Sequence, residues 1–312
     1  MNINTETYLS VVIPIHNEEK NVPELYARLS VVLKALNNPY EIICVNDGSS
    51  DSSLNLLNKI ADGDKKLKIV DLSRNFGHQT AISAGISFAS GQATVVMDGD
   101  LQDPPSVIPA FIKKWEEGFF VVYGIRRKRK EPLLKRMCYF VFYRIQKKMA
   151  KIKIPLDSGD FCLMDKKITD ILKKMPERNR FVRGIRSWVG FSQIGIEYER
   201  DSRFSGKPKY TLRKLLRLAF DGIYSFSDVP LKMSLIVGTF VSGLCFIFII
   251  YIVYQRLAHG TSVYGIATTL VSILFLGGIQ LIAIGIIGEY IGRIYDEVKQ
   301  RPVFIVKELI NL

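Results

Sequence analysis

A pair of carboxylates separated by one glycine is the part of this sequence best suited to chemistry. Asp98 and Asp100 follow an apolar run, and Gln102 comes two residues later, ahead of Asp103 and two prolines. Carboxylate and amide oxygens are hard ligands of the kind that Mg²⁺ or Mn²⁺ takes. A divalent ion held here would bridge the diphosphate of a nucleotide and stabilise the charge that develops on a leaving group. We expect Gly99 to relax the backbone between the two carboxylates.

Other polar residues end two further apolar runs. Pro14 is followed by Asn17 and Glu18, and Asp47 ends the run that leads into the segment V-N-D-G-S-S-D. The Asp47 carboxylate could accept a hydrogen bond from a uracil N–H or a ribose hydroxyl, and Glu18 or Glu19 could reach the ribose. The alternatives are a helix N-cap and a first-turn charge that the helix dipole favours. We assign capping to residues 49–51 and a nucleotide role to Asp47.

The elements that must position these residues alternate between strands and helices. Buried strands that are joined by helices predict an α/β fold with a doubly wound, mostly parallel sheet. Ligands bind such sheets at the carboxyl ends of the strands, where Pro14, Asp47 and Asp98 all fall. The expected strands are 9–15, 40–47, 67–72 and 93–98, and the expected helices include 21–36 and 78–89.

Two uncharged segments near the C-terminal end, 233–254 and 264–288, are each long enough to cross a bilayer. The linker between them has one Arg, whereas the outer flanks are rich in Lys and Arg, so both termini are expected in the cytosol. The N-terminal residues do not resemble a secretory signal. We therefore predict a cytosolic catalytic domain over 1–230, a membrane part over 231–290 and a cytosolic tail over 291–312. Glycines in the second span favour close helix packing, so a homo-oligomer is one expectation.

The formal net charge of +13 suits anionic lipid, phosphorylated substrates or nucleic acid. Residues 126–153 carry 12 basic residues and one acidic residue. Segments 132–153 and 210–227 mix bulky apolar and basic residues, which indicates helices in a membrane interface or, alternatively, amphipathic helices packed on the domain. No nucleic-acid module is recognised. The four cysteines form no C-x-x-C pair and do not cluster with the three histidines, which argues against zinc.

Four motifs resemble those of the inverting family 2 glycosyltransferases, and most closely the polyprenyl-phosphate branch. They are V-V-I-P-I-H-N-E-E, V-N-D-G-S-S-D, S-R-N-F-G-H and D-G-D-L-Q-D-P-P, all within residues 11–105. The resemblance implies a GT-A nucleotide-binding domain. It also implies that the metal and diphosphate are surrounded by Asp98, Asp100 and Gln102, and that the nucleotide pocket is lined by Pro14, Asn17, Glu18, Asp47 and Gly77.

The acceptor side is similar to the same family. Asp157-Ser158-Gly159-Asp160-Phe161 resembles the acceptor loop, and residues 203–210 resemble the mobile loop that meets the phosphates, with Pro208 where Ser is usual. The resemblance implies that the acceptor phosphate meets Arg126, Ser158, Arg203 and Lys209. Asp157 is expected to orient the acceptor or take a proton, or else to shape its loop.

The expected reaction moves glucose from UDP-glucose to undecaprenyl phosphate, with inversion, at the cytosolic face of the inner membrane. A phosphate oxygen is already anionic, so positioning and charge stabilisation should carry most of the rate. A synthase that uses GDP-mannose is the first alternative. A processive polysaccharide synthase is disfavoured because the segment from Arg183 to Trp188 lacks the Gln and the spacing of a Q-x-x-R-W motif. A membrane scaffold is disfavoured by the complete set of carboxylates.

Overall fold

The computed structural model describes residues 7–127, 158–175, 177–178, 180–199, 229–259 and 265–312. The chain divides into two compact units, one of Met1–Leu218 with Arg301–Leu312 and the other of Ala219–Gln300. The expected interface helices, 132–153 and 210–227, lie outside the described residues, as do Asp157, Arg203 and Lys209.

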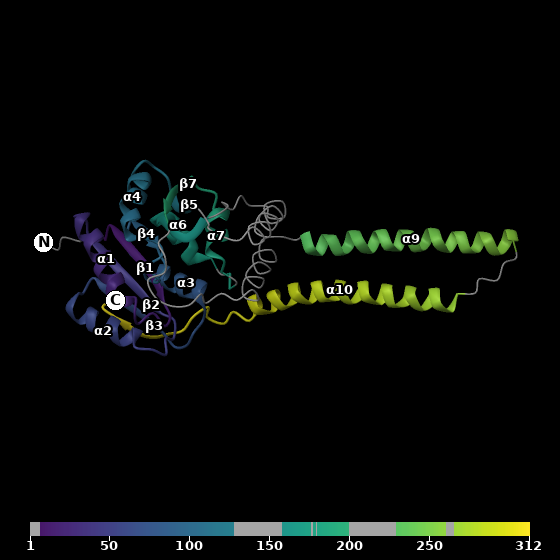
Figure 1. Ribbon diagram of the computed structural model, residues 1–312, viewed down its shortest axis with the longest axis horizontal. Helices are drawn as coiled ribbons and strands as arrows, with labels where there is room; N and C mark the ends of the chain where they lie inside the picture. Colours follow the sequence, from purple (N-terminus) through teal and green to yellow (C-terminus); the bar gives the residue numbers. More distant parts are fainter. Residues whose placement is uncertain (1–6, 128–157, 176, 179, 200–228, 260–264) are drawn as a thin grey trace. The chain divides into compact units, whose positions relative to one another are not determined.

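The first unit is built on one eight-stranded sheet with the order β7-β5-β6-β4-β1-β2-β3-β8 (Figure 1). The four strands β4-β1-β2-β3 are parallel, β6 runs antiparallel between β4 and β5, and β8 pairs antiparallel with β3. The mostly parallel α/β sheet is therefore confirmed. The strands are β1 (Leu9–Ile15), β2 (Tyr40–Asn46), β3 (Leu67–Leu72), β4 (Ala93–Val96), β5 (Val121–Arg127), β6 (Ser158–Asp165), β7 (Gln193–Glu199) and β8 (Val306–Ile310).

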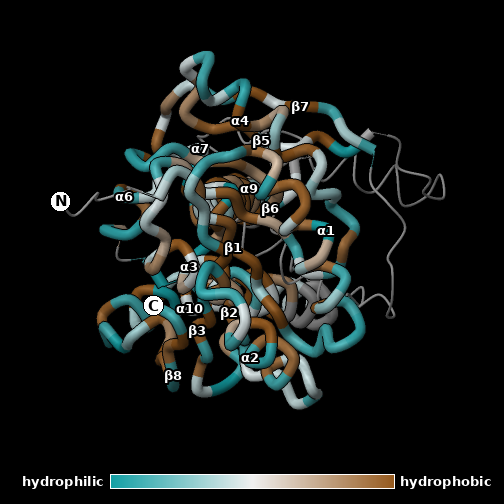
Figure 2. The backbone as a smooth tube through the Cα atoms, turned by 90° about the vertical axis from the view of Figure 1, so that its left-hand side faces the viewer, coloured by the Kyte–Doolittle hydropathy of each residue, from teal (hydrophilic) through white to brown (hydrophobic). Residues whose placement is uncertain are grey.

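Helices cover both faces of this sheet, which is why β1 and β2 are buried along their whole length and are mostly apolar. Side chains such as Ile13 and Cys44 join the core beneath α1 (Val22–Ala35), α2 (Ser53–Gly63) and α4 (Ile108–Glu116), which follows the short turn η1 (Pro105–Val107). Alternate side chains of each strand point to the opposite face of the sheet. Val12 is one of them and faces α3 (His78–Phe88), since a Cβ on Gly85 would overlap Val12. The helices α6 (Lys166–Lys174) and α7 (Val182–Trp188) pack beside α3. Figure 2 shows the hydrophobic strands enclosed by more hydrophilic helices and loops.

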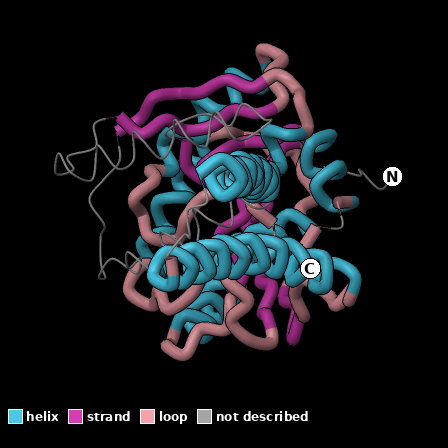
Figure 3. Tube along the Cα trace, turned by 90° about the vertical axis from the view of Figure 1, so that its right-hand side faces the viewer, coloured by secondary structure: helices cyan, strands magenta, loops and turns pink. Residues whose placement is uncertain are grey.

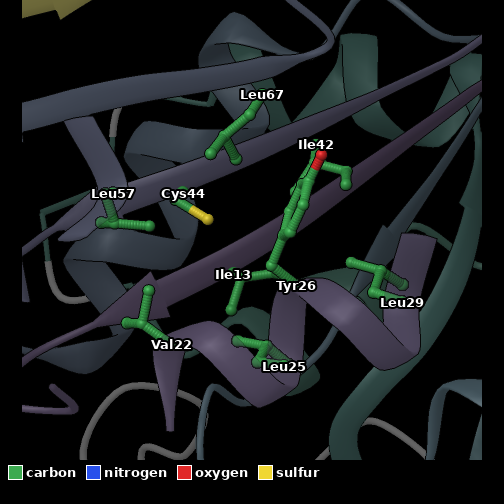
Figure 4. A pocket seen from close by; sticks show the side chains of 9 residues that line it. All are labelled: Ile13, Val22, Leu25, Tyr26, Leu29, Ile42, Cys44, Leu57 and Leu67. Atoms are coloured by element: carbon green, nitrogen blue, oxygen red, sulfur yellow. The ribbon is translucent and has the colours of Figure 1, made fainter. Parts of the chain in front are cut away.

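A small apolar pocket lies in the core between α1, α2 and the strands. Figure 4 shows nine side chains that line it, and the only polar group among them besides the Cys44 thiol is the hydroxyl of Tyr26. Burial raises the pKa of Cys44 to about 12, so this thiol stays protonated. The pocket therefore offers nothing that would bind a nucleotide, and it is part of the packing rather than of a site.

The C-terminal residues do not form a separate tail. Residues Val306–Ile310 form β8 at the edge of the sheet, where Ile69 pairs with Ile310 and Asp71 with Glu308. Asn311 donates hydrogen bonds from Nδ2 to the carbonyl oxygens of Ala61 and Leu67, both at 2.9 Å. The expectation of a separate tail over 291–312 is therefore wrong. The strand β8 covers an edge of the sheet that would otherwise expose the unpaired backbone groups of β3.

The second unit contains two long apolar helices, α9 (Val229–His259) and α10 (Ile266–Val298), each a continuous ribbon in Figure 1 and drawn in cyan in Figure 3. Stretches of 27 residues in α9 and 24 in α10 are apolar enough to cross a membrane, and neither is buried within the protein. Both helices are longer than the uncharged segments 233–254 and 264–288, because a helix can continue into charged residues beyond the apolar stretch. Added Cβ atoms at Gly277, Gly285 and Gly288 would meet nothing within 4 Å.

Candidate active site

The site lies where the carboxyl ends of the parallel strands meet. Because β6 runs antiparallel to β4 and β5, its first residues lie at the same edge as Asp98 and Arg126. β7 is parallel to β5 and brings Tyr198 to this edge. The sheet thus gathers residues from four separate regions of the chain, as expected for ligand binding in such folds.

The imidazole of His78 lies between two carboxylates. Its Nε2 is 3.3 Å from Oδ1 of Asp98 and 3.4 Å from Oδ2 of Asp160. Arg183 donates to Asp160 from Nε at 2.9 Å and from Nη2 at 3.4 Å, and Gln79 donates to it from Nε2 at 3.1 Å. The Asp160 side chain is only 8% exposed. It is therefore a buried carboxylate whose charge is compensated by donors from α3 and α7.

These contacts change the acidity of all three groups. Burial lowers the pKa of His78, but the hydrogen bond to Asp160 and the two carboxylate charges outweigh it and raise the pKa to about 9. Burial raises the pKa of Asp98 to about 6, helped by neighbouring carboxylates and opposed by His78. Burial also opposes ionisation of Asp160, but Arg183 and His78 hold its pKa well below the usual value. The two carboxylates thus favour the protonated imidazole, and the imidazole and Arg183 favour the ionised form of Asp160.

The turn after β4 fits a divalent ion that is also held by a substrate. Asp98 Oδ1 is buried and accepts no hydrogen bond of good geometry, and Asp100 is only 7% exposed. Gln102 donates its backbone N–H to Oδ1 of Asp100 at 3.2 Å, which fixes that carboxylate beside the turn. Among the described residues no three His, Cys, Asp or Glu side chains form a metal site by themselves. One or two carboxylates completed by phosphate oxygens is the usual arrangement for Mg²⁺, so the residues fit such an ion.

Gly99 is needed here for space rather than for backbone freedom. It is not among the glycines with positive φ, but a Cβ at this position would lie 2.7 Å from Cδ1 of Ile15 and 3.2 Å from the carbonyl oxygen of Pro14. The expectation that Gly99 relaxes the backbone is corrected accordingly. The unusual backbone belongs to Leu101, a buried residue with φ of 59°.

Asp47 is buried at the end of β2, and its carboxylate organises a neighbouring loop. Oδ1 accepts the N–H of Phe76 at 2.7 Å, and Oδ2 accepts the N–H of Gly77 at 3.0 Å. Gly77 has φ of 101° and precedes the first residue of α3, His78. Asp47 therefore holds the loop that leads directly to the His78 cluster. Its role toward a nucleotide stays a prediction.

The residues after β1 connect to the loop after β2. Asn17 has φ of 54°, and its Oδ1 accepts the N–H of Ser50 at 2.8 Å. Glu18 donates its N–H to Ser53 Oγ at 2.9 Å and accepts a hydrogen bond from Asn21. Pro14 is buried within β1. The structure thus places all three residues at the expected edge of the sheet, and their contact with a nucleotide stays a prediction.

Arg126 is held at this edge of the sheet by residues to which the sequence assigned no role, and its contact with an acceptor stays a prediction. Nη2 lies 3.8 Å from Oδ2 of the fully buried Asp103, and Nε donates to the hydroxyl of Tyr198 at 3.4 Å. Tyr198 in turn donates to Oδ1 of Asp103 at 2.5 Å. A Cβ on Gly159 would lie 2.9 Å from Nη2, so this glycine allows the guanidinium to cross β6. Ser158, the first residue of β6, pairs with Ile125 of β5.

The sequence provided weak signals for the residues that were missed. His78 ends the motif S-R-N-F-G-H and Asp160 lies in the acceptor-loop motif, yet neither was given a role. Arg183 stands out in the sequence only for its spacing to Trp188. No local pattern indicates that these three meet, because their proximity depends on the reversed direction of β6 and on the packing of α7 against α3.

Comparisons with known proteins agree with this architecture. Residues 10–172 match the family Glycosyl transferase family 2, and residues 229–294 match the family GtrB C-terminal hairpin. An uncharacterized glycosyltransferase, YkcC, of Bacillus subtilis is 47% identical over 96% of this chain and 93% of its own length. A prophage-derived bactoprenol glucosyl transferase of Shigella flexneri is 41% identical over 96% of this chain and 97% of its own.

A crystal structure of mannosyl-3-phosphoglycerate synthase from Rubrobacter xylanophilus aligns with a TM-score of 0.47 and 17% identity, over 69% of this chain and 71% of that one. The family match spans the four parallel strands and the carboxylate turn that follow from the sequence. The relatives cover almost the whole chain, including both apolar helices. The chain therefore belongs to glycosyl transferase family 2, and it is a glycosyltransferase with the GT-A fold.

Proposed function

We propose that this enzyme transfers glucose from UDP-glucose to a polyprenyl phosphate, such as undecaprenyl phosphate, with inversion at the anomeric carbon. The observation that carries the proposal is the carboxylate turn Asp98–Asp100 at the same sheet edge as Arg126, in a chain with two apolar helices. The named relative from Shigella flexneri, a bactoprenol glucosyl transferase, supports the choice of sugar and lipid.

We assign the binding of the donor and the binding of the acceptor phosphate to different residues of the site. Asp98, Asp100 and Gln102 would hold Mg²⁺ or Mn²⁺ together with the diphosphate of the donor, and this ion would supply charge stabilisation for the leaving nucleotide. Pro14, Asn17, Glu18, Asp47 and Gly77 would line the nucleotide pocket. Arg126, Ser158, Arg203 and Lys209 would bind the acceptor phosphate, since guanidinium groups form charge-assisted hydrogen bonds with phosphate oxygens.

An oxygen of the lipid phosphate would attack the anomeric carbon while the bond to the nucleoside diphosphate breaks on the opposite face. The attacking oxygen is anionic near neutral pH, so the protein needs to position it rather than activate it. Asp157 would orient the acceptor or take a residual proton. Because the lipid stays in the bilayer, we place the catalytic unit and both termini on the cytosolic side of the inner membrane.

The test is a product assay with the purified full-length protein, UDP-glucose, undecaprenyl phosphate and either Mg²⁺ or Mn²⁺. We expect a lipid-linked monophosphate sugar, with turnover reduced by a factor of about 100 or more in Asp100→Ala, since one ligand and its charge are lost. A panel of GDP-mannose and N-acetylated donors tests the choice of sugar. Equal turnover by Asp100→Ala would remove the metal site, and a polymeric product would favour a processive synthase.

A further inference from the structure

The helix α7 lies between the two segments that match known families, residues 10–172 and 229–294, yet it reaches the carboxylate site. Its second residue, Arg183, directs the guanidinium to the buried carboxylate of Asp160. Nε lies 2.9 Å from Oδ1 and Nη2 lies 3.4 Å from Oδ2, so the two groups meet at two points. Such forked contacts fix the orientation of a carboxylate as well as its charge.

The same carboxylate is held from a second direction by α3. Gln79 donates from Nε2 to Oδ2 of Asp160 at 3.1 Å, and its Oε1 accepts the N–H of Val182 at 3.0 Å. Gln79 thereby ties the first turn of α7 to α3. The orientation of Asp160 is thus determined by Arg183 and Gln79 together, and both depend on how α7 is packed.

Asp160 is connected to Asp98, the proposed metal ligand, through His78. Oδ2 lies 3.4 Å from Nε2 of His78, and the same nitrogen lies 3.3 Å from Oδ1 of Asp98. The contacts therefore run in sequence from Arg183 through Asp160 and His78 to Asp98. Groups that hold a metal ligand in place are commonly worth 10–100-fold in metal affinity or activity.

We propose that Arg183 is a positioning residue for metal-dependent nucleotide binding, which acts on Asp98 through Asp160 and His78. The inference rests on the proposed function, because it assumes that Asp98 holds a divalent ion beside a nucleoside diphosphate. Without Arg183, Asp160 loses a fork of two contacts and the positive charge that supplies them. The imidazole is then free to move toward Asp160, which would remove its 3.3 Å contact with Asp98.

The experiment measures UDP binding to the full-length protein by calorimetry, once in Mn²⁺ and once in EDTA. The relevant quantity is the ratio of the two affinities. In Arg183→Gln we expect this ratio to fall by a factor of about 10 or more, while the affinity in EDTA stays within about twofold of the unmodified protein. Arg183→Lys keeps the charge without the fork. Its affinity ratio should therefore lie between that of the unmodified protein and that of Arg183→Gln.

Arg180→Gln is the matched control. Arg180 precedes α7 by two residues, and its guanidinium donates to the backbone carbonyl oxygens of Met175 and Glu177 rather than to a carboxylate. This variant should lose thermal stability but keep the affinity ratio. A double-mutant cycle with Asp160→Asn should show that the effects of Arg183→Gln and Asp160→Asn do not add, because both break the same contact.

Three results overturn the inference. The first is an unchanged affinity ratio in Arg183→Gln, or in Arg183→Lys if Arg183→Gln does not fold. The second is an equal fall of the ratio in Arg180→Gln, which indicates a general effect of this segment on folding. The third is an unmodified protein that binds UDP equally in Mn²⁺ and in EDTA. Failure of the lipid product assay with intact metal-dependent UDP binding removes the proposed acceptor but not the role of Arg183.

Discussion

The carboxylate of Asp47 connects the end of β2 to the loop before α3, since it accepts the N–H groups of both Phe76 and Gly77. Asp47 is only 3% exposed, so these bonds form away from solvent. A buried donor that loses its acceptor costs about 1–3 kcal/mol. A single side chain can therefore affect both the stability of this loop and any ligand that the loop contacts.

We predict that Asp47→Ala lowers the free energy of unfolding by about 1–3 kcal/mol and speeds amide exchange at Phe76 and Gly77. UDP affinity should fall as well, because the loop shapes the proposed pocket. Urea unfolding, hydrogen exchange and calorimetry measure the three effects. The control is Asp62→Ala, which removes an exposed carboxylate of α2. Unchanged exchange at Phe76 and Gly77 would contradict this account.

At the scale of elements, Glu41 connects three strands. This residue of β2 is 2% exposed and accepts hydrogen bonds from Ser10 of β1 at 2.5 Å, Lys68 of β3 at 2.6 Å and the N–H of Ser90 at 2.7 Å. Burial raises its pKa, but these bonds outweigh burial and the net pKa lies below the usual 4.5. The ionised form therefore stabilises the fold above about pH 4.5, and this contribution is lost as the pH falls through the folded-state pKa.

We predict that Glu41→Gln lowers the free energy of unfolding at pH 7 by about 1–3 kcal/mol, because Lys68 loses its charged partner. The difference from the unmodified protein should shrink below about pH 4.5, where Glu41 itself becomes protonated. Urea unfolding at several pH values measures this. Glu24→Gln, which removes the exposed partner of Arg28, should change stability by less than about 1 kcal/mol. If Glu41→Gln lowers the free energy of unfolding by the same amount at every pH, Glu41 is not ionised in the folded protein.

The C-terminal strand depends on one residue with unusual backbone geometry. Asn311 has φ of 60°, a conformation that Asn tolerates better than most residues, and its side chain bonds to Ala61 and Leu67. We predict that Asn311→Ala destabilises the protein by about 1–3 kcal/mol and speeds amide exchange in β3. Asn311→Gly keeps the backbone conformation and isolates the loss of the hydrogen bonds. If exchange in β3 is unchanged in both variants, β8 does not protect this edge.

At the scale of the whole molecule, α9 and α10 expose apolar side chains along their length, including Phe240, Phe246 and Ile282, each more than 60% exposed. A surface of this kind is stable only in lipid, in detergent or against another protein. This surface and the match of residues 229–294 to the GtrB C-terminal hairpin indicate that the two helices associate the enzyme with the membrane. Two spans with basic outer flanks would return the chain to the side on which it began.

We predict that a cysteine at position 262, between α9 and α10, reacts with a membrane-impermeant maleimide added to intact cells, in a variant that lacks the native cysteines. A cysteine at Val31, which is 71% exposed on α1, should react only after the cells are opened. The physical reason is the excess of Lys and Arg outside the two spans. Labelling of Val31→Cys in intact cells would place the catalytic unit on the wrong side for a cytosolic nucleotide donor.

The strands, the two apolar helices and the carboxylate turn could be predicted from the sequence, because each depends on residues that are adjacent along the chain. The apolar runs identified β1, β2, β3 and β4 to within two residues, because burial on both faces demands continuous apolar side chains. The length of the two uncharged segments identified the two apolar helices, although the ends of the helices differ by several residues. The carboxylate turn was placed at the correct edge of the sheet, since the carboxyl ends of parallel strands share one edge.

Contacts between distant segments were decided only by the tertiary structure. The reversed direction of β6 brings Asp160 to His78, and α7 adds Arg183, although 105 positions separate residues 78 and 183. β8 returns to the sheet edge after both apolar helices. Side-chain periodicity reports whether a strand is buried, but not which strand lies beside it or in which direction it runs. That choice depends on how the whole chain buries its apolar surface and pairs its polar groups.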